Sequence, residues 1–432
     1  MKSVFRFGGL IVILTCVLGG LSACQSSSPK KADSKGPEAP RSELKKKFHV
    51  DPQYRWASEI YTLKTRPVIS AMPSGDEIYS GGFSGLFLLR QNSDKSLRLV
   101  THTDRGPNGD VYTDPVTGDK LRPFAQPTFQ PRWIDLSTDP ETRTLSIRTQ
   151  TFLTTPSGRF LSGLPNSESK DERPMSLLGR PVPFDPLGID PEGITMDHKG
   201  IVWMVEEYRP SILKFDDSGK LLKRFVPKNS LTPEEIKMWN SLAGESTLST
   251  TLPEILNSRS KNRGFEGVAV LGKFLYAALQ SPLPGEKDFL ILEMDLRTEK
   301  VTRILKYPMT DEKVDKIGDL AAWNKGLVVL EQEGKIGKDS VHHLFHVTIP
   351  PKGDQLTKVG IADLSALGFD DAEKIEGLAA IDESTLAVIN DDDFGLTTNL
   401  DIEKGRIALT KERPVRLMIL RRLPTTEGQS SP

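Results

Sequence analysis

The sequence predicts an all-β protein, a β-propeller of six blades that carries one helical insertion. Short β-branched and aromatic runs separated by Gly, Pro, Asn and Asp dominate the chain, and no long amphipathic helical pattern does. A short motif recurs along the body at spacings typical of repeated β-sheet units. A second polar position follows that motif at a fixed distance, so each repeat contains at least two strands.

The composition excludes several classes of function. The chain has 432 residues and a formal net charge of −1, which argues against nucleic-acid binding because that function needs a basic face. Two cysteines, Cys16 and Cys24, are too few for a disulfide scaffold or a multi-cysteine zinc or iron–sulfur site.

Residues 1–23 have the features of a bacterial lipoprotein signal peptide. Lys2 and Arg6 precede an apolar run over 7–18 that is too short to favour a membrane span. The run ends in Leu21-Ser22-Ala23-Cys24, which resembles a lipobox, a motif that implies cleavage before the cysteine and lipidation of its thiol. The alternative is a plain signal peptide, because Ala23 also suits ordinary cleavage. If Cys24 is lipidated, the folded body has no free thiol, which excludes thiol catalysis.

The segments that flank the predicted fold are polar. Gln25 after the lipobox resembles an outer-membrane sorting signal, so we expect a lipid-anchored protein of the bacterial cell envelope. Residues 24–50 read as the lipidated cysteine and a disordered tether, because they contain Ser, Pro and Lys and little apolar surface. The propeller is assigned to 51–424 and a disordered tail to 425–432, and we expect a monomer.

The repeat is a carboxylate–glycine pair within an apolar strand. The pairs are Glu192-Gly193, Glu266-Gly267 and Glu376-Gly377, with degenerate copies at Gly318-Asp319 and Ser84-Gly85. In the three full copies a polar residue follows 14 positions after the glutamate, at the end of a second apolar strand. The starts at 84, 192, 266, 319 and 376 leave a gap of 108 residues between the first two, which has room for a further blade around 132–136 and 145–152. The total is then six blades.

Two further features complete the predicted ring. Tyr61-Thr62-Leu63 is expected to pair with a C-terminal strand over 415–420, which removes the open edges that an unclosed propeller would have. Thr232-Pro233-Glu234-Glu235 is a capping box with proline at the first helical position, which predicts a helical insertion around 231–256. A second, loop-rich insertion is expected over 156–186.

Residues at equivalent positions of a propeller recur around one axis, so the repeated carboxylates should converge at one mouth. Two carboxylates about 5 Å apart repel by roughly 3 kcal/mol at an effective dielectric of 20, so the cluster needs compensation. A calcium site is one solution, because oxygen ligands without Cys or His favour Ca²⁺ or Mg²⁺. Pairing with Arg105, Arg209 and Arg263 is a second, and dispersed acids in a water-filled channel are a third. The candidate metal ligands are Asp104, Glu192, Glu206, Glu207, Glu266, Asp319, Glu376 and Asp391. Gln280, Glu331 and Asn390 end neighbouring strands and are expected nearby.

Several motifs taken together resemble the bacterial phytase-like family, described as "esterase-like activity of phytase". They are Thr103-Asp104-Arg105-Gly106, Asp190-Pro191-Glu192-Gly193-Ile194, Glu206-Glu207-Tyr208-Arg209-Pro210, Asn262-Arg263-Gly264-Phe265-Glu266-Gly267, Leu279-Gln280-Ser281-Pro282-Leu283 and Lys374-Ile375-Glu376-Gly377-Leu378. The resemblance spans about 66–422 and implies an exported β-propeller with phosphoesterase or esterase activity. Gly318-Asp319 departs from the Glu-Gly pattern.

Two functions follow as hypotheses. In the first, the protein is a calcium-dependent phosphoesterase acting on a phosphorylated small molecule. Its ligands or general base would be Glu192, Glu266 and Glu376, and its phosphate-binding groups Arg105, Arg209 and Arg263. In the second, it is a non-enzymatic propeller lipoprotein that holds a ligand or a protein in its central mouth. The sequence shows no nucleophile.

Overall fold

Residues 48–166, 171–309, 311, 313–334, 340–410 and 413–424 are described by the structure, which is a computed structural model. The predicted signal peptide, Cys24, tether residues 24–47 and the predicted tail 425–432 lie outside them. In the part of the chain that is described, no helix is long and apolar enough to cross a membrane.

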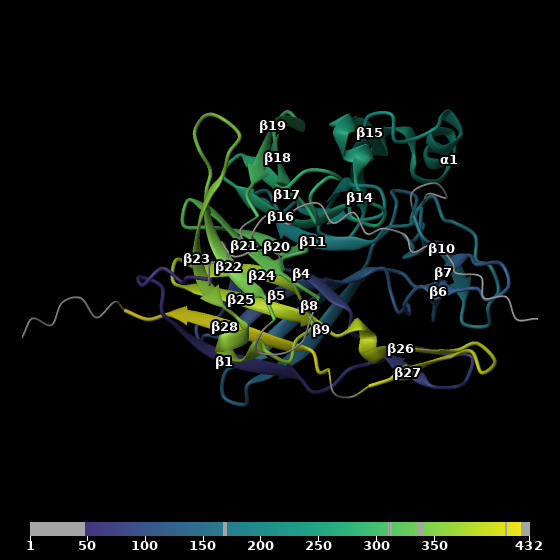
Figure 1. The fold of residues 1–432 in the computed structure, drawn as a ribbon, viewed down its shortest axis with the longest axis horizontal. Coiled ribbons are helices and arrows are strands. Elements are labelled where there is room, and N and C mark those ends of the chain that lie inside the picture. The colour runs from purple at the N-terminus through teal and green to yellow at the C-terminus, as the bar shows by residue number, and fades with distance from the viewer. Residues whose placement is uncertain are drawn as a thin grey trace, which may run out of the picture. The chain divides into compact units, whose positions relative to one another are not determined.

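Antiparallel sheets of four main strands, each called a blade here, form the fold (Figure 1). Blade 1 contains β4 (Phe83–Gln91), β5 (Leu97–Thr103), β8 (Arg132–Asp139) and β9 (Thr144–Phe152); blade 2 contains β11 (Pro191–Met196), β12 (Val202–Glu206), β13 (Ser211–Phe215), β14 (Leu221–Pro227) and the added β15 (Leu248–Leu252); blade 3 contains β16 (Phe265–Leu271), β17 (Phe274–Leu279), β18 (Phe289–Asp295) and β19 (Lys300–Tyr307); blade 4 contains β20 (Lys316–Trp323), β21 (Gly326–Gln332), β22 (His342–Thr348) and β23 (Thr357–Asp363); blade 5 contains β24 (Lys374–Asp382), β25 (Thr385–Asp391), β28 (Arg416–Arg422) and β1 (Trp56–Leu63). In every blade the first strand is followed outward by the others, the arrangement of a β-propeller.

The described residues form five blades, and the predicted count of six is therefore wrong. The first strands of the blades contact one another in the closed order β4, β11, β16, β20, β24 and back to β4. Five hydrophobic clusters each fill the space between two consecutive blades. The strands expected to form a sixth blade, around 132–136 and 145–152, are β8 and β9, the outer half of blade 1. The long gap in the repeat therefore contains the outer half of blade 1 together with loops and short strands.

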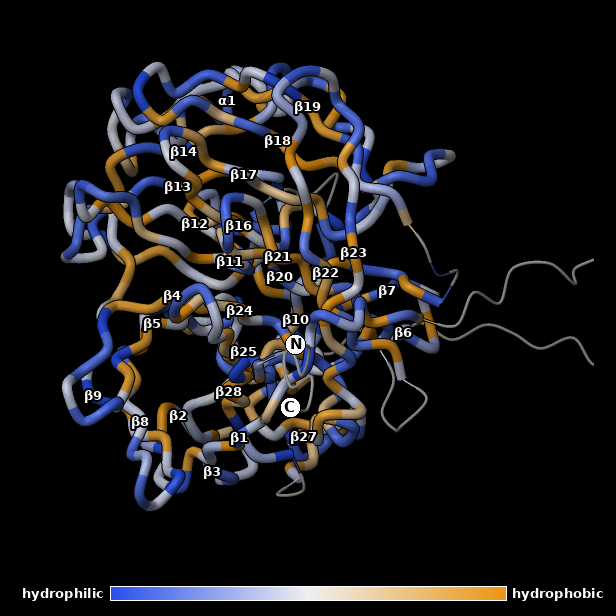
Figure 2. The backbone as a smooth tube through the Cα atoms, turned by 90° about the vertical axis from the view of Figure 1, so that its left-hand side faces the viewer, coloured by the Kyte–Doolittle hydropathy of each residue, from blue (hydrophilic) through white to orange (hydrophobic). Residues whose placement is uncertain are grey.

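Burial explains why the strand sequences differ between the middle and the rim of a blade. Every residue of β25 is buried, because blades 1 and 4 cover both faces of blade 5, and its sequence is apolar until its polar end. In the rim strand β9 only Leu145 is buried, and the other residues are partly or fully exposed. Figure 2 shows the same division, with hydrophobic strands and hydrophilic turns.

The glycine of the repeat lies where the inner strands come closest. A Cβ atom at Gly193 would lie 2.9 Å from the Cα of Gly267 in the next blade. One at Gly377 would lie 2.9 Å from the carbonyl oxygen of Gly85. Because side chains at these positions would push the blades apart, the expected role of the repeated glycine is confirmed.

The ring is closed by strands from the two ends of the described chain. The strand β1 pairs antiparallel with β28, with Tyr61 opposite Leu417, as predicted (Figure 1). The segment before β1 is also ordered, since Val50 bridges to Gly360 of β23 and Phe48 stacks on His343 with ring centroids 3.6 Å apart. Packing against blade 4 therefore begins within the residues assigned to the tether.

In sequence, the predicted helical insertion lies between the fourth strand of blade 2 and the first strand of blade 3. It contains α1 (Pro233–Ala243), which starts at the predicted capping box: Thr232 accepts a hydrogen bond from the Glu235 backbone, and the Glu235 side chain accepts one from the Thr232 backbone. Two 3₁₀ turns, η1 (Glu245–Thr247) and η2 (Glu254–Ser258), flank β15. Trp239 of α1 is buried against blade 2, so the helix is part of the packed structure.

Short strands and turns cover one end of the inner strands. They are β2 (Val68–Ala71), β3 (Glu77–Tyr79), β6 (Tyr112–Thr113), β7 (Lys120–Phe124), β10 (Arg173–Ser176), β26 (Leu396–Asp401) and β27 (Arg406–Leu409), with a π-helical turn η3 (Ser365–Phe369) and a 3₁₀ turn η4 (Asp393–Gly395) elsewhere in the connections. A sixth hydrophobic cluster, which includes Phe129 and Phe394, holds several of these segments together. The loop-rich insertion expected over 156–186 contributes β10 to this group.

Candidate functional site

A β-bulge sets the position of the repeated carboxylates. The ladder between the first and second strands shifts register at the repeat in blades 2, 3, 4 and 5. The extra residue in these bulges is Glu192, Glu266, Gly318 and Glu376, respectively. A bulge adds one unpaired residue, re-aims its side chain and bends the strand locally. The three glutamates therefore recur around the propeller axis, as the sequence predicted.

The three repeated glutamates are buried but have different partners. The Oε2 of Glu192 accepts a hydrogen bond of 3.1 Å from the Ser84 hydroxyl, and the Oε2 of Glu266 accepts one of 2.6 Å from the Gln280 amide. The Oε1 of Glu376 instead lies 2.7 Å from the ammonium of Lys316. Only Glu376 has a cationic partner in direct contact among the described residues.

These partners change the acidity of the three groups. Burial raises the pKa of Glu192 well above its usual range, and the carboxylates of Glu266 and Asp104 raise it further. Burial likewise raises the pKa of Glu266, and Lys316 offsets this only in part. Burial also disfavours the charged form of Glu376, but Lys316 and Lys374 outweigh it and hold its pKa below the usual range. Two of the repeated glutamates thus lack compensation for a full negative charge.

Glu192 belongs to a cluster of three carboxylates. One oxygen each from Asp104, Asp190 and Glu192 lie within 4.8 Å of one another. The other contact of Asp190 is an ion pair of 2.6 Å between its Oδ2 and the Nη1 of Arg105, while its Oδ1 is buried and has no hydrogen-bond partner among the described residues. Burial raises the pKa of Asp190 well above its usual range despite Arg105. The geometry suits a shared cation.

Two members of the carboxylate cluster, Asp104 and Glu192, line a cavity of about 360 Å³ at this end of the inner strands. The cavity is lined by acids and bases together. The acids include Asp104, Glu192, Glu207, Glu376 and Asp393, and the bases are Arg105, Arg122, Arg263, Lys316, Lys374 and Arg413. At the other end, all five inner strands surround a shallow opening lined by residues such as Leu86, Ile194 and Leu378. The charge is therefore concentrated at one end of the propeller.

Glu207 and Arg263 meet at the edge of the charged cavity. The Oε2 of Glu207 accepts a hydrogen bond of 2.8 Å from Asn262, and its Oε1 lies 3.5 Å from the guanidinium of Arg263. The Arg263 side chain is 47% exposed, so it can reach a ligand in the cavity. Burial raises the pKa of Glu207, although Arg105 and Arg263 counteract it.

Asp319, a predicted metal ligand, lies outside this cavity. The degenerate repeat reverses the order of the pair, so Gly318 occupies the glutamate position and Asp319 the glycine position. The Asp319 carboxylate accepts hydrogen bonds of 2.7 Å from the backbone amides of Leu320 and Leu378, which links blades 4 and 5. Its role is to join inner strands, and the prediction that it lies at the mouth is wrong.

Glu206 and Arg209 also turn away from the cavity. Glu206 is fully buried and pairs with Arg224 at 2.5 Å within blade 2. Arg209 pairs with Glu235 of α1 at 2.7 Å and lines separate cavities beside that helix. Their neighbour Glu207 does line the central cavity.

Most of the remaining strand-end residues form contacts within the blades and do not line the cavity. Asp391 is buried and lies 3.4 Å from Lys374, whose ammonium is closer to Asp393 at 2.6 Å. Glu331 pairs with Lys358 of the same blade, and Asn390 accepts a hydrogen bond from the Arg416 backbone. Of this group only Gln280 lies in the lining of the cavity. The shared offset in sequence therefore gives a shared strand position but not a shared site.

The pairing alternative raised by the sequence is met only in part. The arginines that the sequence offered as partners bind other carboxylates: Arg105 binds Asp190, Arg209 binds Glu235 and Arg263 binds Glu207. A lysine neutralises the third repeated glutamate. Glu192 and Glu266 remain without an arginine in contact.

Comparison with known proteins assigns a family. Residues 78–394, well over half of the chain, match the family described as "Phytase-like: Esterase-like activity of phytase". The chain belongs to this family. The match includes every inner strand and all but one of the cavity's cationic residues, Arg413.

More distant similarities exist. An uncharacterized secreted protein of Arthroderma benhamiae is 27% identical to this phytase-like protein over 186 residues, which cover 37% of the chain and 34% of the relative. The chain thus matches about a third of the length of that curated relative. Among solved structures, the PQQ-bound aldose sugar dehydrogenase of Streptomyces coelicolor has 8% identity and a TM-score of 0.35, with 84% of this chain and 98% of that chain covered. Virginiamycin B lyase of Staphylococcus aureus has 10% identity and a TM-score of 0.33, with 85% and 100% covered. These values are too low to inform the chemistry of this protein.

Sequence reasoning missed three residues that define the site. Asp190 precedes a predicted ligand by two positions, and its ion pair with Arg105 joins residues 85 positions apart. Lys316 and Lys374 lie at the start of their strands, close to the repeat position in sequence. Lys316 and Lys374 each precede the bulge position of their repeat by two residues. This shared position in two successive repeats was the sequence signal that could have identified them.

Proposed function

We propose that this phytase-like protein is a hydrolase of anionic esters, with phosphoesters as the first class to test, and that the reaction takes place in the charged cavity. The observation that supports the proposal is that acidic and basic side chains line the same cavity. Asp104 and Glu192 of the under-compensated carboxylate cluster line the same cavity as cationic side chains that can bind a phosphate.

The carboxylate cluster fits calcium. Two oxygens bound to one Ca²⁺ at about 2.4 Å each can lie at most about 4.8 Å apart, and the three ligand oxygens fall within that limit. All three donors are carboxylates, and Asp190 keeps a buried oxygen free. A bound cation would supply positive charge to the substrate and to the attacking oxygen.

The other side chains of the cavity supply binding and proton transfer. Arg263 and Lys316 are placed to hold the substrate anion, Arg263 through its planar donors and Lys316 as a point charge. Glu207 lines the cavity and is held by Asn262, and burial raises its pKa toward the range of a general base. We assign Glu207 the role of the general base that accepts a proton from an attacking water molecule.

One observation favours a second function, a non-enzymatic binding propeller. The described residues that line the cavity include no Ser, Cys or His, so no side-chain nucleophile of these types is present. In that case the same charges would hold an anionic or zwitterionic ligand without turnover.

Hydrolysis of an aryl phosphate and of phytate, with and without added Ca²⁺, separates the two functions. We expect phosphate release that rises with Ca²⁺ and falls by about 10²-fold or more in Glu207→Gln and Asp104→Asn. Asp110→Asn, at an exposed position of the same lining, is the matched control and should retain activity. Binding of phosphate or phytate without release of product would support the binding propeller instead.

We further propose that the protein is lipidated at Cys24 and anchored in the bacterial cell envelope, on the outer membrane. The lipobox supports this, and the secreted relative supports export. In a Gram-negative host the wild-type protein should partition into detergent, and Cys24→Ser should release it or stall its processing. Identical processing and fractionation of both forms would contradict the anchor.

A further inference from the structure

A second cavity lies between α1 and blade 2. Its volume is about 210 Å³, and its walls are mainly apolar. The apolar residues of the lining are Pro186, Val226, Leu231, Met238, Trp239 and Leu248. The cavity shares no lining residue with the charged cavity, so it is a separate site.

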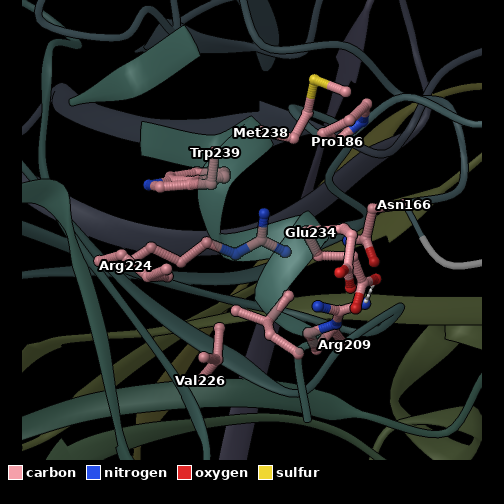
Figure 3. A pocket seen from close by; sticks show the side chains of 11 residues that line it. Asn166, Pro186, Arg209, Arg224, Val226, Glu234, Met238 and Trp239 are labelled. Carbon is pink, nitrogen blue, oxygen red and sulfur yellow. Dashed lines mark hydrogen bonds and ion pairs between the residues drawn. The ribbon is translucent and has the colours of Figure 1, made fainter. Parts of the chain in front are cut away.

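One arginine reaches into this apolar space. The Arg224 guanidinium points toward the centre of the lining side chains, with Trp239 above it and Val226 below it in Figure 3. It lies over the Trp239 ring, with its Cζ 5.2 Å from the ring centroid. The Arg224 side chain is only 3% exposed, so any charge that it meets in the cavity is poorly screened by water.

The bonds of Arg224 leave part of its guanidinium available. Its Nε donates to the Ser211 hydroxyl at 3.1 Å, and its Nη2 pairs with Glu206 at 2.5 Å. Glu206 also accepts hydrogen bonds from Ser211 and from the Tyr208 backbone, so its charge is shared. Nη1 makes no hydrogen bond to a described residue, which leaves two of the five N–H donors for a ligand. Burial lowers the pKa of Arg224, and Glu206 offsets this only in part, so a second anion would stabilise the charged guanidinium.

The other charges of the cavity are engaged or peripheral. Arg209 and Glu235 form an ion pair of 2.7 Å, drawn with a dashed line in Figure 3, and Glu235 also caps α1. Glu234 is exposed at the start of the helix. The Trp239 indole N–H donates to Thr247, so the ring offers the cavity an apolar surface.

We propose that this cavity binds a small organic acid, a carboxylate attached to an aliphatic or aromatic body of a few carbon atoms. The carboxylate would meet the free donors of Arg224, and the apolar body would lie against Trp239, Val226 and Leu248. The volume admits a small molecule and is too small for a peptide or a lipid chain of full length. The half-exposed Met238 at the rim can move to admit it, since methionine is flexible.

Calorimetric titration of the full folded chain tests this proposal. The probes are 3-phenylpropionate and hexanoate, and their uncharged counterparts are 3-phenylpropan-1-ol and hexan-1-ol. We expect the acids to bind at least about tenfold more tightly than the alcohols, which corresponds to about 1.4 kcal/mol. No heat from either acid up to about 10 mM, or equal binding of acid and alcohol, would overturn the proposal.

Two variants locate the binding. Val226→Phe fills the cavity and should abolish binding of the acids, whereas Val116→Phe, at a position that is 90% exposed in another loop, should leave it unchanged. Because Val226→Phe can fail to fold, the double variant Glu206→Gln with Arg224→Met provides a second test, since it removes both charges of the buried pair. It should keep the fold by circular dichroism and lose the preference for acid over alcohol. An unchanged preference would place the acid elsewhere and overturn the assignment.

Discussion

The repeated glutamates on two sides of the propeller differ in which groups neutralise their negative charge. On the side of blades 2 and 3, Glu192 and Glu266 have neutral partners and a raised pKa. On the side of blade 5, Glu376 has Lys316 in contact and a lowered pKa. All three occupy one bulge position in one repeat. The partner therefore decides the charge state, and the uncompensated side is where a cation would be attracted.

The largest expected effect comes from removing the compensation at blade 5. Lys316→Met leaves Glu376 buried without its partner, and we expect a loss of about 3–5 kcal/mol in the free energy of unfolding at neutral pH. Urea denaturation measures it. Lys352→Met, at an exposed position of the same blade, is the control and should cost little. Equal stability of the two variants would show that the buried pair contributes nothing.

Calcium should act on the opposite side of the ring. At a hundredfold excess over its Kd, Ca²⁺ should raise the free energy of unfolding by about 2.7 kcal/mol, and a chelator should reverse this. Asp190→Asn should reduce the response, because Asp190 belongs to the carboxylate cluster. Asp319→Asn should lower stability but leave the response intact. Melting curves that do not change with Ca²⁺ would leave the cluster without a metal function.

The pH dependence should have opposite signs on the two sides. The folded pKa of Glu266 is raised, so the folded state binds more protons, and stability should fall as pH rises above about 4.5 with a slope of at most about 1.4 kcal/mol per pH unit. Glu266→Gln should flatten this fall in chelated protein. The folded pKa of Glu376 is lowered, so its contribution is present at neutral pH and is lost as pH falls. Glu376→Gln should therefore cost stability at about pH 7, and this cost should shrink as pH falls through the lowered pKa of Glu376. If stability changed with pH in the same way in both variants, the predicted difference between Glu266 and Glu376 would be wrong.

The smallest expected effect on stability is at the rim. Arg263 is 47% exposed, and its pair with Glu207 should contribute less than about 1 kcal/mol, so Arg263→Ala should barely change unfolding. If the cavity binds phosphoesters, the same variant should raise KM several-fold. A change in stability without a change in KM would assign Arg263 a structural role only.

The sequence was a good guide wherever a pattern repeats. The glutamate–glycine pair and its fixed offset predicted the propeller, the close approach of inner strands and the convergence of Glu192, Glu266 and Glu376. The capping box predicted α1, and the ring closure by Tyr61-Thr62-Leu63 was found at β1. Each of these depends on local geometry, which a short motif specifies.

The errors arose where long connections or single substitutions decide the outcome. The gap before the second repeat contains the outer strands of blade 1 together with β6, β7 and β10, and length alone could not separate these from a sixth blade. The reversal of Gly318 and Asp319 moved a carboxylate from the cavity to the strand junction. The partner of Glu376 comes from the neighbouring blade 60 positions away, so no local pattern contains it.

Pairing of β1 with β28 also bears on the order of folding. The pair joins residues about 360 positions apart, since Trp56 lies opposite Arg422. Contacts of such long range are slow to form, because the intervening chain must first be brought together. Until the last strand has emerged during synthesis or export, β25 and β1 each have an unpaired edge, and such edges promote aggregation. The ring can close only after β28 has been synthesised, so loss of this strand by truncation would be far more harmful than its small size implies.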